Sequence, residues 1–241
     1  QRSTLIPENA GSDWARIVSA IASQTTPSFR GHPSPAVPGA GGISNPARVG
    51  RVPGDFALGF LPFLHLAREG APPYPEAFPQ LVHVASLITN TFQLIASPAL
   101  GVTSLDEIRT GRRAVRIGTG PPGSGEEFLL RETLAIHGMS YQDIRSWGGR
   151  IDLLGSGERA DLFRDYHVDL IAFHANAPTA AITELMLSRA GRFLALPEAT
   201  RQHLRQRPSD GAGAHRSREG PGRAGDRLVR PGIGLERTGH V

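Results

Sequence analysis

Apolar positions recur along this chain with two different periods, and the alternation between the two predicts an α/β fold. Residues 4–6 form a strand-like segment, and the apolar side chains that follow, Trp14, Ile17, Val18 and Ile21, share one face of a helix. The alternation continues to residue 196, with strands expected at residues 56–60, 81–88, 91–97, 114–119, 169–175 and 193–196. Helices are expected to begin near residues 45, 62, 105, 126 and 178, and another helix to end at residues 161–166. Repeated strand–helix units predict a parallel sheet with helices on both faces.

This pattern stops near residue 207. Residues 208–241 have almost no periodic apolar positions and are rich in Gly, Arg and Pro. Such a composition is typical of disordered chain, so we expect the folded part to end there.

The composition excludes several kinds of chemistry. The sequence has no cysteine, and all 26 basic residues are arginine. A thiol nucleophile, a thiolate zinc site, a Schiff-base lysine and a phosphate-loop lysine are therefore excluded.

The net charge of +4 is evenly divided between residues 1–207 and residues 208–241, because residues 208–241 hold six Arg and four acidic residues and so contribute +2. No basic stripe is interleaved with aromatic residues, so a nucleic acid is not expected as a partner.

No apolar run reaches the roughly 18 residues that a membrane-spanning helix needs. The chain begins at Gln1, without Met and without a signal-peptide pattern. Such a start is compatible with an export signal that has been removed but does not show one.

Four polar loops lead into predicted helices, at residues 9–14, 41–45, 120–126 and 176–179. Helix N-termini at the carboxyl ends of strands present free backbone N–H groups. Four of them together resemble a small pocket for a carboxylate, although each alone is more simply explained as a helix cap.

The sequence shows no catalytic or metal-binding arrangement. The glycine loop at residues 118–125 is followed by Glu126 and Glu127, where a phosphate loop needs lysine. The nine histidines do not pair at metal-ligand spacing, and no nucleophile elbow is present. His174 precedes the loop at 176–179, where it either faces the pocket or is an ordinary core or rim histidine. We expect no enzyme activity, no cofactor and no metal; the alternative is an enzyme on the same fold.

Several segments resemble the motifs of one family. Residues 104–118 are similar to the "S-L-x-D-L-x-G-K-x-V-x-V-G" segment of two-lobed periplasmic solute-binding proteins. Residues 122–127 resemble a "G-S-G-T-E" loop, and residues 168–182 resemble "D-A-x-F-x-x-G-A-P-T-A-A-I", the most specific match. Residues 41–45 and 54–60 resemble "G-G-S-x-x-N" and "G-x-x-D-x-A-F". These motifs are similar to those of the TAXI family, the solute receptors of tripartite ATP-independent periplasmic (TRAP) transporters.

The resemblance implies a two-lobed periplasmic-binding-protein-like fold of type II. Residues 1–92 would form lobe 1, residues 93–197 lobe 2, and residues 198–241 a helix remnant and a disordered tail. The residues expected to line the cleft, from the resemblance and the polar loops, are Asn9, Ser12, Trp14, Asn45, Ser124, Gly125, Asn176, Pro178 and Thr179.

The implied function is that of an extracytoplasmic receptor, periplasmic or extracellular, with or without a membrane anchor. It would deliver a small anionic solute, an amino acid or carboxylate such as glutamate, to the membrane permease of a TRAP transporter. Neither a cofactor nor a nucleic acid is implied.

Three departures from the family change this picture. Glu126 stands where the family has threonine, and an acidic group there disfavours a carboxylate ligand unless an arginine offsets it. Pro62 occupies a position that often holds a polar ligand residue. The tail matches nothing in the family, whose chain crosses back to complete the first lobe. Our hypothesis is a frameshift or truncation near residue 207, which leaves the first lobe incomplete and allows a non-functional remnant as a further alternative.

Overall fold

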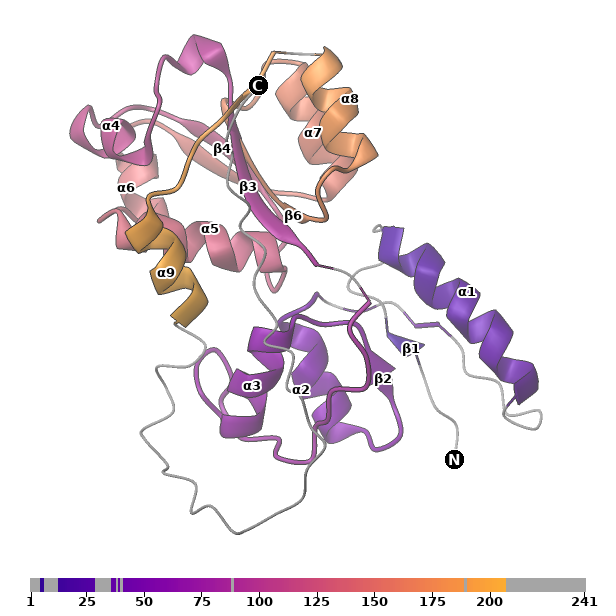
Figure 1. Ribbon diagram of the computed structural model, residues 1–241. Helices are drawn as coiled ribbons and strands as arrows, with labels where there is room; N and C mark the ends of the chain where they lie inside the picture. Colours follow the sequence, from indigo (N-terminus) through magenta and orange to yellow (C-terminus); the bar gives the residue numbers. More distant parts are fainter. Residues whose placement is uncertain are drawn as a thin grey trace.

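The computed structural model describes residues 5–6, 13–28, 36–37, 39, 41–87, 89–188 and 190–206. The elements form two groups, which we call the small lobe and the large lobe (Figure 1). The small lobe contains β1 (Leu5–Ile6), α1 (Asp13–Ser28), α2 (Ser44–Arg51), β2 (Phe56–Ala57) and α3 (Leu61–Glu69). The large lobe contains β3 (Thr91–Ala96), a 3-10 turn (Pro98–Leu100), α4 (Leu105–Thr110), β4 (Arg116–Thr119), α5 (Gly125–Ile136), α6 (Tyr141–Ser146), β5 (Arg150–Leu153), α7 (Ser156–Arg164), β6 (Leu170–Ala175), α8 (Ala180–Ser188), β7 (Arg192–Phe193) and α9 (Glu198–Gln206).

The sheet of the large lobe has the strand order β5-β4-β6-β3-β7. The strands β5, β4 and β6 are parallel, whereas β3 runs antiparallel to both β6 and β7. The predicted parallel sheet is therefore confirmed for three strands and wrong for β3. The reason is that β3 enters from the small lobe, at the edge where β6 ends, so that Thr91 pairs with Ala175 and Ala96 with Leu170.

Helices cover both faces of this sheet, as the sequence predicts. Along β6, Leu170 and Ala172 belong to the core cluster that also contains α5 residues, whereas Ile171 and Phe173 belong to the cluster under α7 and α8. Successive strand residues face opposite sides, so a strand buried on both faces must be apolar throughout. The four residues are less than 5% exposed, and burying a large apolar side chain contributes roughly 1.5–3 kcal/mol.

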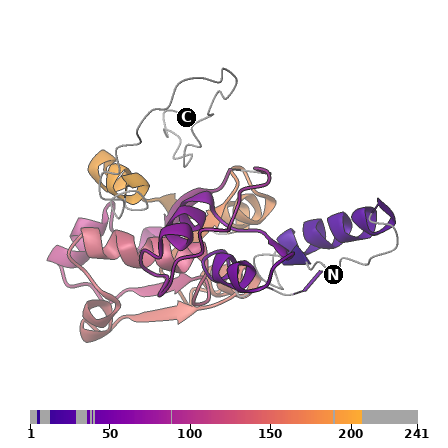
Figure 2. The same cartoon turned by 90° about the horizontal axis from the view of Figure 1, so that it is seen from below.

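The small lobe has its own, thinner core. The strands β1 and β2 pair in parallel over two residues each. A cluster that includes Ile43, Phe63 and Phe78 holds α2 and α3 together, and the buried Tyr74 hydroxyl donates to the Ile43 carbonyl oxygen at 2.7 Å. The helix α1 extends away from the remaining elements (Figure 2), although its Val18 side chain is buried.

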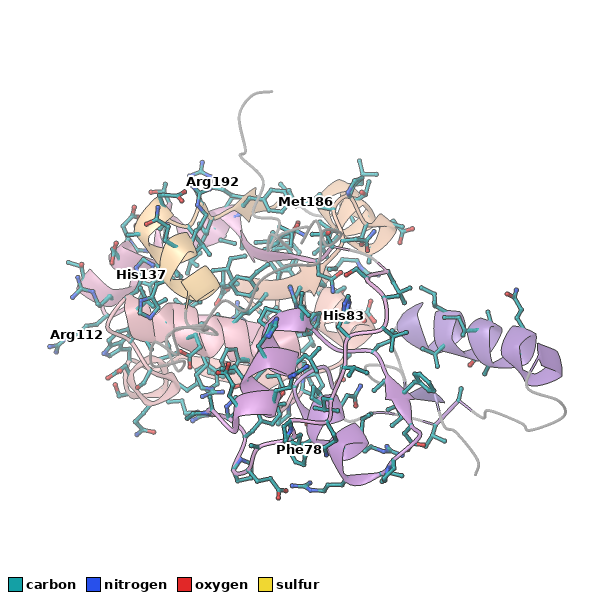
Figure 3. The ribbon with its side chains drawn as sticks, turned by 60° about the horizontal axis from the view of Figure 1, so that its bottom comes forward. Phe78, His83, Arg112, His137, Met186 and Arg192 are labelled. Carbon is teal, nitrogen blue, oxygen red and sulfur yellow. The ribbon has the colours of Figure 1, made fainter. Side chains whose placement is uncertain are left out.

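Several predicted elements change in the structure. The strand expected at 56–60 is paired only at Phe56–Ala57, and the one expected at 193–196 is β7, Arg192–Phe193. Residues 81–87 are not a strand, and Val82 and Val84 are about 70% exposed. His83 lies in this segment between the lobes (Figure 3).

Two elements of the large lobe, α6 and β5, were not expected from the sequence. The edge strand β5 carries no fully buried residue, so it lacks the apolar run that indicates a strand.

None of the helices in the described part of the chain is long and apolar enough to span a membrane. The disorder predicted for residues 208–241 concerns residues outside the described ranges. The division near residue 92 stays a prediction.

Candidate functional site

The candidate site lies at the edge of the large-lobe sheet where the parallel strands end. The strand β4 ends at Thr119, β6 ends at Ala175, and α5 begins at Gly125 after the loop of residues 120–124. The small lobe meets this same edge, because β3 enters the sheet here. In α/β sheets this is the edge at which ligands bind.

The start of α5 is shaped by glycine and serine. Ser124 is the N-cap residue, and its Oγ accepts the Glu127 N–H at 3.3 Å. Gly120 is required because a Cβ there would collide with the Ser124 hydroxyl. The first N–H groups of a helix have no intrahelical partner, and those of Gly125 and Glu126 are at the positive end of a 12-residue helix.

The loop at residues 41–45 of the small lobe packs directly on this helix start. The Ile43 N–H donates to the Gly123 carbonyl oxygen at 3.2 Å. Gly41 has φ +124°, and a Cβ on it would collide with the same carbonyl group. Only glycine allows this approach between the lobes.

The pair Asn45-Pro46 indicates a helix start with Asn45 as the N-cap, but α2 begins at Ser44 and its N-cap is Ile43, so Asn45 lies inside the helix. Its Nδ2 donates to the Leu58 carbonyl oxygen at 2.8 Å, and the side chain is 1% exposed. The structure thus brings Asn45, Ser124 and Gly125 to one interface. In this conformation the side chains of Asn45 and Ser124 make hydrogen bonds within their own lobes, to Leu58 and Glu127, and so stabilise the loops at residues 41–45 and 120–124.

Aromatic contacts close the interface. The Phe60 ring centroid is 4.3 Å from that of His174, and Phe63 meets Phe128 edge to face at 4.9 Å. A Cβ on Gly125 would lie 2.5 Å from Phe60 Cε2 and 2.7 Å from His174 Nδ1. Glycine at the first position of α5 is therefore what lets Phe60 and His174 meet.

His174 is uncharged at neutral pH. Burial lowers its pKa from 6.5 to about 4, and the Glu126 carboxylate opposes this shift only in part. Its Nδ1 is buried and has no hydrogen-bond partner among the described residues. The Oγ1 of Thr119, which is fully buried at the end of β4, also lacks one.

Glu126 is paired with a buried arginine. Arg159 of α7 is 1% exposed, and its Nη2 lies 3.1 Å from Glu126 Oε1. Its guanidinium stacks 4.9 Å from the Phe173 ring centroid, and its Nη1 donates to the Leu154 carbonyl oxygen at 3.3 Å. The sequence indicated that Glu126 would disfavour a carboxylate ligand unless an arginine offset its charge, and Arg159 is that arginine.

The remaining expected contacts lie apart from this cluster. Asn176 and Pro178 follow β6 at the same edge and are exposed. Thr179 caps α8, with its Oγ1 accepting the Ile182 N–H at 3.4 Å. Asn9, Ser12 and the side chain of Trp14 lie outside the described residues.

Sequence reasoning missed Phe60 and Arg159. Arg159 is 33 residues from Glu126, so no local spacing indicates the pair. Phe60 belongs to the apolar run at residues 56–60, which indicates a strand and gives no sign of the contact between Phe60 and His174.

A second polar cluster has the connectivity of a catalytic triad without its accessibility. His137 lies beneath α9 (Figure 3), with its Nδ1 3.1 Å from Asp106 Oδ1 and its Nε2 3.2 Å from Thr200 Oγ1. Thr200 is 3% exposed, so its hydroxyl cannot meet a substrate. The cluster ties α4, α5 and α9 together.

A shallow surface hollow lies at the opposite edge of the sheet and is lined by Ala99, Leu100, Arg113, Ala114 and Asp169. Its charged groups are engaged within the protein: Asp169 accepts from Arg116 at 2.6 Å, and Arg113 donates to the Leu100 carbonyl oxygen at 3.0 Å.

No group of His, Asp and Glu that could hold a metal ion occurs among the described residues.

The two lobes and the helix terminus between them define a class, the α/β fold of periplasmic solute-binding proteins. The chain belongs to the NMT1-like family, whose model matches residues 14–210. No curated protein matches the chain.

Solved structures with this fold are similar in shape but distant in sequence. The binding protein of an ABC phosphonate transporter from Pseudomonas aeruginosa has a TM-score of 0.51 and 13% identity, over 81% of this chain and 65% of that one. The glycine betaine/L-proline-binding protein ProX from Borrelia burgdorferi has a TM-score of 0.51 and 12% identity, over 83% and 71%. The alkanesulfonate-binding protein SsuA from Xanthomonas axonopodis pv. citri has a TM-score of 0.48 and 17% identity, over 82% of this chain and 61% of that one. The chain thus spans between 61% and 71% of the length of these proteins.

These matches confirm the predicted periplasmic-binding-protein-like fold. Each of these structures is named as a binding protein.

Proposed function

We propose that this protein is an extracytoplasmic receptor that binds a small anionic solute between its lobes and passes it to a membrane transporter. The observation that carries the proposal is the start of α5, where Gly123 and Ser124 meet the small-lobe loop at residues 41–43 and Gly125 lies against Phe60 of the same lobe. A helix N-terminus with free N–H groups is an anion site, and a contact between two lobes is a common place for ligands.

The electrostatics of this interface favour an anion. Glu126 is neutralised by Arg159, and His174 is uncharged at neutral pH, so neither residue cancels the positive end of α5. A carboxylate of an amino acid or organic acid is our first candidate. The phosphonate and sulfonate binders that share the fold are named for other small anions, which are the next candidates.

Binding requires the lobes to move apart and close again. In the described conformation Phe60, Gly125 and His174 are in direct contact, which leaves no space for a solute between them. Residues 82–90 connect the lobes, and residues 82–87 are exposed and belong to no helix or strand, which suits a hinge.

We further propose delivery to a TRAP transporter in the periplasm or outside the cell, with Asn9, Ser12, Trp14, Asn45, Ser124, Gly125, Asn176, Pro178 and Thr179 lining the open cleft. The support is the likeness of residues 122–127 and 168–182 to the TAXI motifs. Solute uptake into proteoliposomes with the partner permease should require a sodium or proton gradient. Uptake that requires ATP would instead assign the receptor to an ABC transporter.

Thermal unfolding tests solute binding. Glutamate, glutamine, 2-oxoglutarate, succinate, methylphosphonate, methanesulfonate and glycine betaine are each added to the purified chain. A ligand at about 100 times its Kd should stabilise by about 2.7 kcal/mol, which raises the Tm by several degrees.

The Gly125→Ala variant, whose new Cβ enters the lobe interface, should lose this shift. Gly157→Ala is the matched control, because nothing lies within 4 Å of a Cβ at Gly157, and it should keep the shift. If no anion raises the Tm of the wild-type chain, the proposed function is wrong.

A further inference from the structure

We infer that the Glu126–Arg159 ion pair sets the charge of the solute that the site accepts, so that monoanions bind in preference to dianions. The inference rests on the proposed function and adds a selectivity to it. In this inference Glu126 is the specificity-determining residue, and Arg159 is a positioning residue that acts through Glu126.

The pair is built into the end of the strand that forms the site. The stem of Arg159 passes over Gly118, where an added Cβ would lie 3.1 Å from Arg159 Cγ. The Glu126 side chain packs against Gly120, where any Cβ would collide with it. Two glycines of β4 and its loop thus make room for the two side chains, and a change at either partner is felt at the loop.

Burial keeps both charges in place. The side chain of Arg159 is 1% exposed and that of Glu126 is 12% exposed. The guanidinium is further held by Phe173 and by the Leu154 carbonyl oxygen. Arginine does not lose its proton in proteins, so the compensation of Glu126 is permanent rather than dependent on pH.

The field of this pair reaches the interface between the lobes. The Glu126 carboxylate acts on the protonation of His174, whose ring contacts Phe60 of the small lobe. Glu126 is also the second residue of α5, next to the N–H groups that would receive an anion. Charges at such a partly buried place are only weakly screened.

The charge balance then favours one negative charge on the solute. Glu126 and Arg159 sum to zero, His174 is neutral, and the end of α5 supplies about half a positive charge. A monoanion is matched by this partial charge, whereas a dianion brings a second negative charge for which the cluster holds no uncompensated cation.

The test compares probes of similar shape and different charge, by isothermal titration calorimetry at pH 8.5. The pairs are succinamate with succinate and methanesulfonate with methylphosphonate. The measured quantity is the ratio of dianion Kd to monoanion Kd, in the wild-type chain and in Glu126→Gln, Arg159→Met and the double variant. Glutamine can still accept the Arg159 hydrogen bond, so Glu126→Gln is expected to fold.

The exposed pair Arg51–Glu76 of the small lobe, at 2.7 Å, supplies matched controls. Arg51→Met and Glu76→Gln change the net charge of the protein by the same amounts, far from α5 in the sequence.

In the wild type the dianion should bind more weakly. Glu126→Gln should move the ratio about tenfold toward the dianion, the size expected from one unit charge near a partly desolvated site. Arg159→Met should move it in the opposite direction, and the double variant should return to within about threefold of the wild type. The two controls should leave the ratio unchanged.

Two outcomes would overturn the inference in different ways. If the variants weaken monoanions and dianions by equal factors, the pair is only structural, although the receptor function stands. If the wild-type chain binds none of the four probes and no other anion, the proposed function fails and the inference fails with it.

Discussion

His174 is an imidazole placed between an aromatic ring of one lobe and the first residue of a helix in the other. Its pKa is lowered to about 4, with burial as the main cause and Glu126 opposing it. In the unfolded chain the pKa returns to about 6.5, so between these values the unfolded state binds more protons than the folded state. Stability from His174 is therefore fully present above about pH 6.5 and is lost as the pH falls toward 4.

The variant His174→Phe should flatten this dependence. The wild-type free energy of unfolding should fall by on the order of 3 kcal/mol between pH 7 and pH 4 because of this group. Urea unfolding at several pH values measures the slope. His203→Ala, which changes an exposed histidine of α9, should keep the wild-type slope. Equal slopes in His174→Phe and the wild type would show that this imidazole is not the group responsible.

Gly125 and Gly157 allow a comparison of two glycines near helix starts. A Cβ at Gly125 would lie 2.5 Å from Phe60, whereas a Cβ at Gly157 would meet nothing within 4 Å. Gly125→Ala should cost about 1–3 kcal/mol by overpacking, and Gly157→Ala should be neutral or stabilise by up to about 1 kcal/mol. Chemical denaturation measures both, and an equal effect at the two sites would contradict the tight contact.

The role of a residue in this site could be predicted only where it depends on neighbours in the sequence. Ser124 was identifiable as a cap from its place before Gly125 and two acidic residues, and the structure confirms the cap. Arg159 was not identifiable, because its role depends on a partner in another helix.

At the scale of elements, α9 is attached to the large lobe by a polar contact. The Thr200 hydroxyl meets the buried His137 ring at the C-terminal end of α5. Leu204 on the same helix is 6% exposed, so the apolar face of α9 is also covered.

Replacing this hydroxyl by a methyl group should loosen α9. Thr200→Val leaves the buried Nε2 of His137 without a partner, which costs about 1–3 kcal/mol. Hydrogen exchange should show faster exchange in α9 than in β6. His203→Ala, on the exposed side of the same helix, should leave the protection unchanged; unchanged protection in Thr200→Val would mean that packing alone holds α9.

Helix starts were predicted from the sequence better than strand pairing. The residues Ser104 to Glu107 have the pattern of a capping box, and Ser104 does cap α4 by accepting the Glu107 N–H. The Glu107 carboxylate accepts from the Thr103 N–H rather than from the Ser104 N–H, so this box is incomplete. The complete box is at Ser140 and Asp143. The direction of β3 could not be predicted, because it depends on where the chain enters the sheet rather than on the residues of the strand.

At the scale of the whole molecule, the lobes meet through a small set of contacts around Phe60. This ring touches His174 across the interface and lies 2.5 Å from the position that a Cβ of Gly125 would take. The periodicity of the sequence predicted the α/β layers, and the family motifs predicted two lobes. Neither indicated that the two glycine loops would touch, because this contact joins residues about eighty positions apart.

Phe60→Ala should shift the lobes toward an open arrangement. Removing the ring removes its contact with His174 and its packing against Gly125, so fewer contacts hold the lobes together. Small-angle X-ray scattering should show a larger radius of gyration, reversed by a bound solute. Leu187→Ala, at a position 83% exposed on α8, is the control. An unchanged radius in Phe60→Ala would show that other contacts hold the lobes closed.

The position of β3 also affects how the chain is made. This strand is synthesised before every other strand of its sheet, yet it lies between β6 and β7, which are synthesised last. On the ribosome, residues 91–96 must therefore remain unpaired until residues 170–193 have emerged. Strand pairs so distant in sequence form slowly and leave an apolar edge exposed meanwhile. A nascent chain of this protein is thus expected to need a chaperone at the stage between β3 and β6.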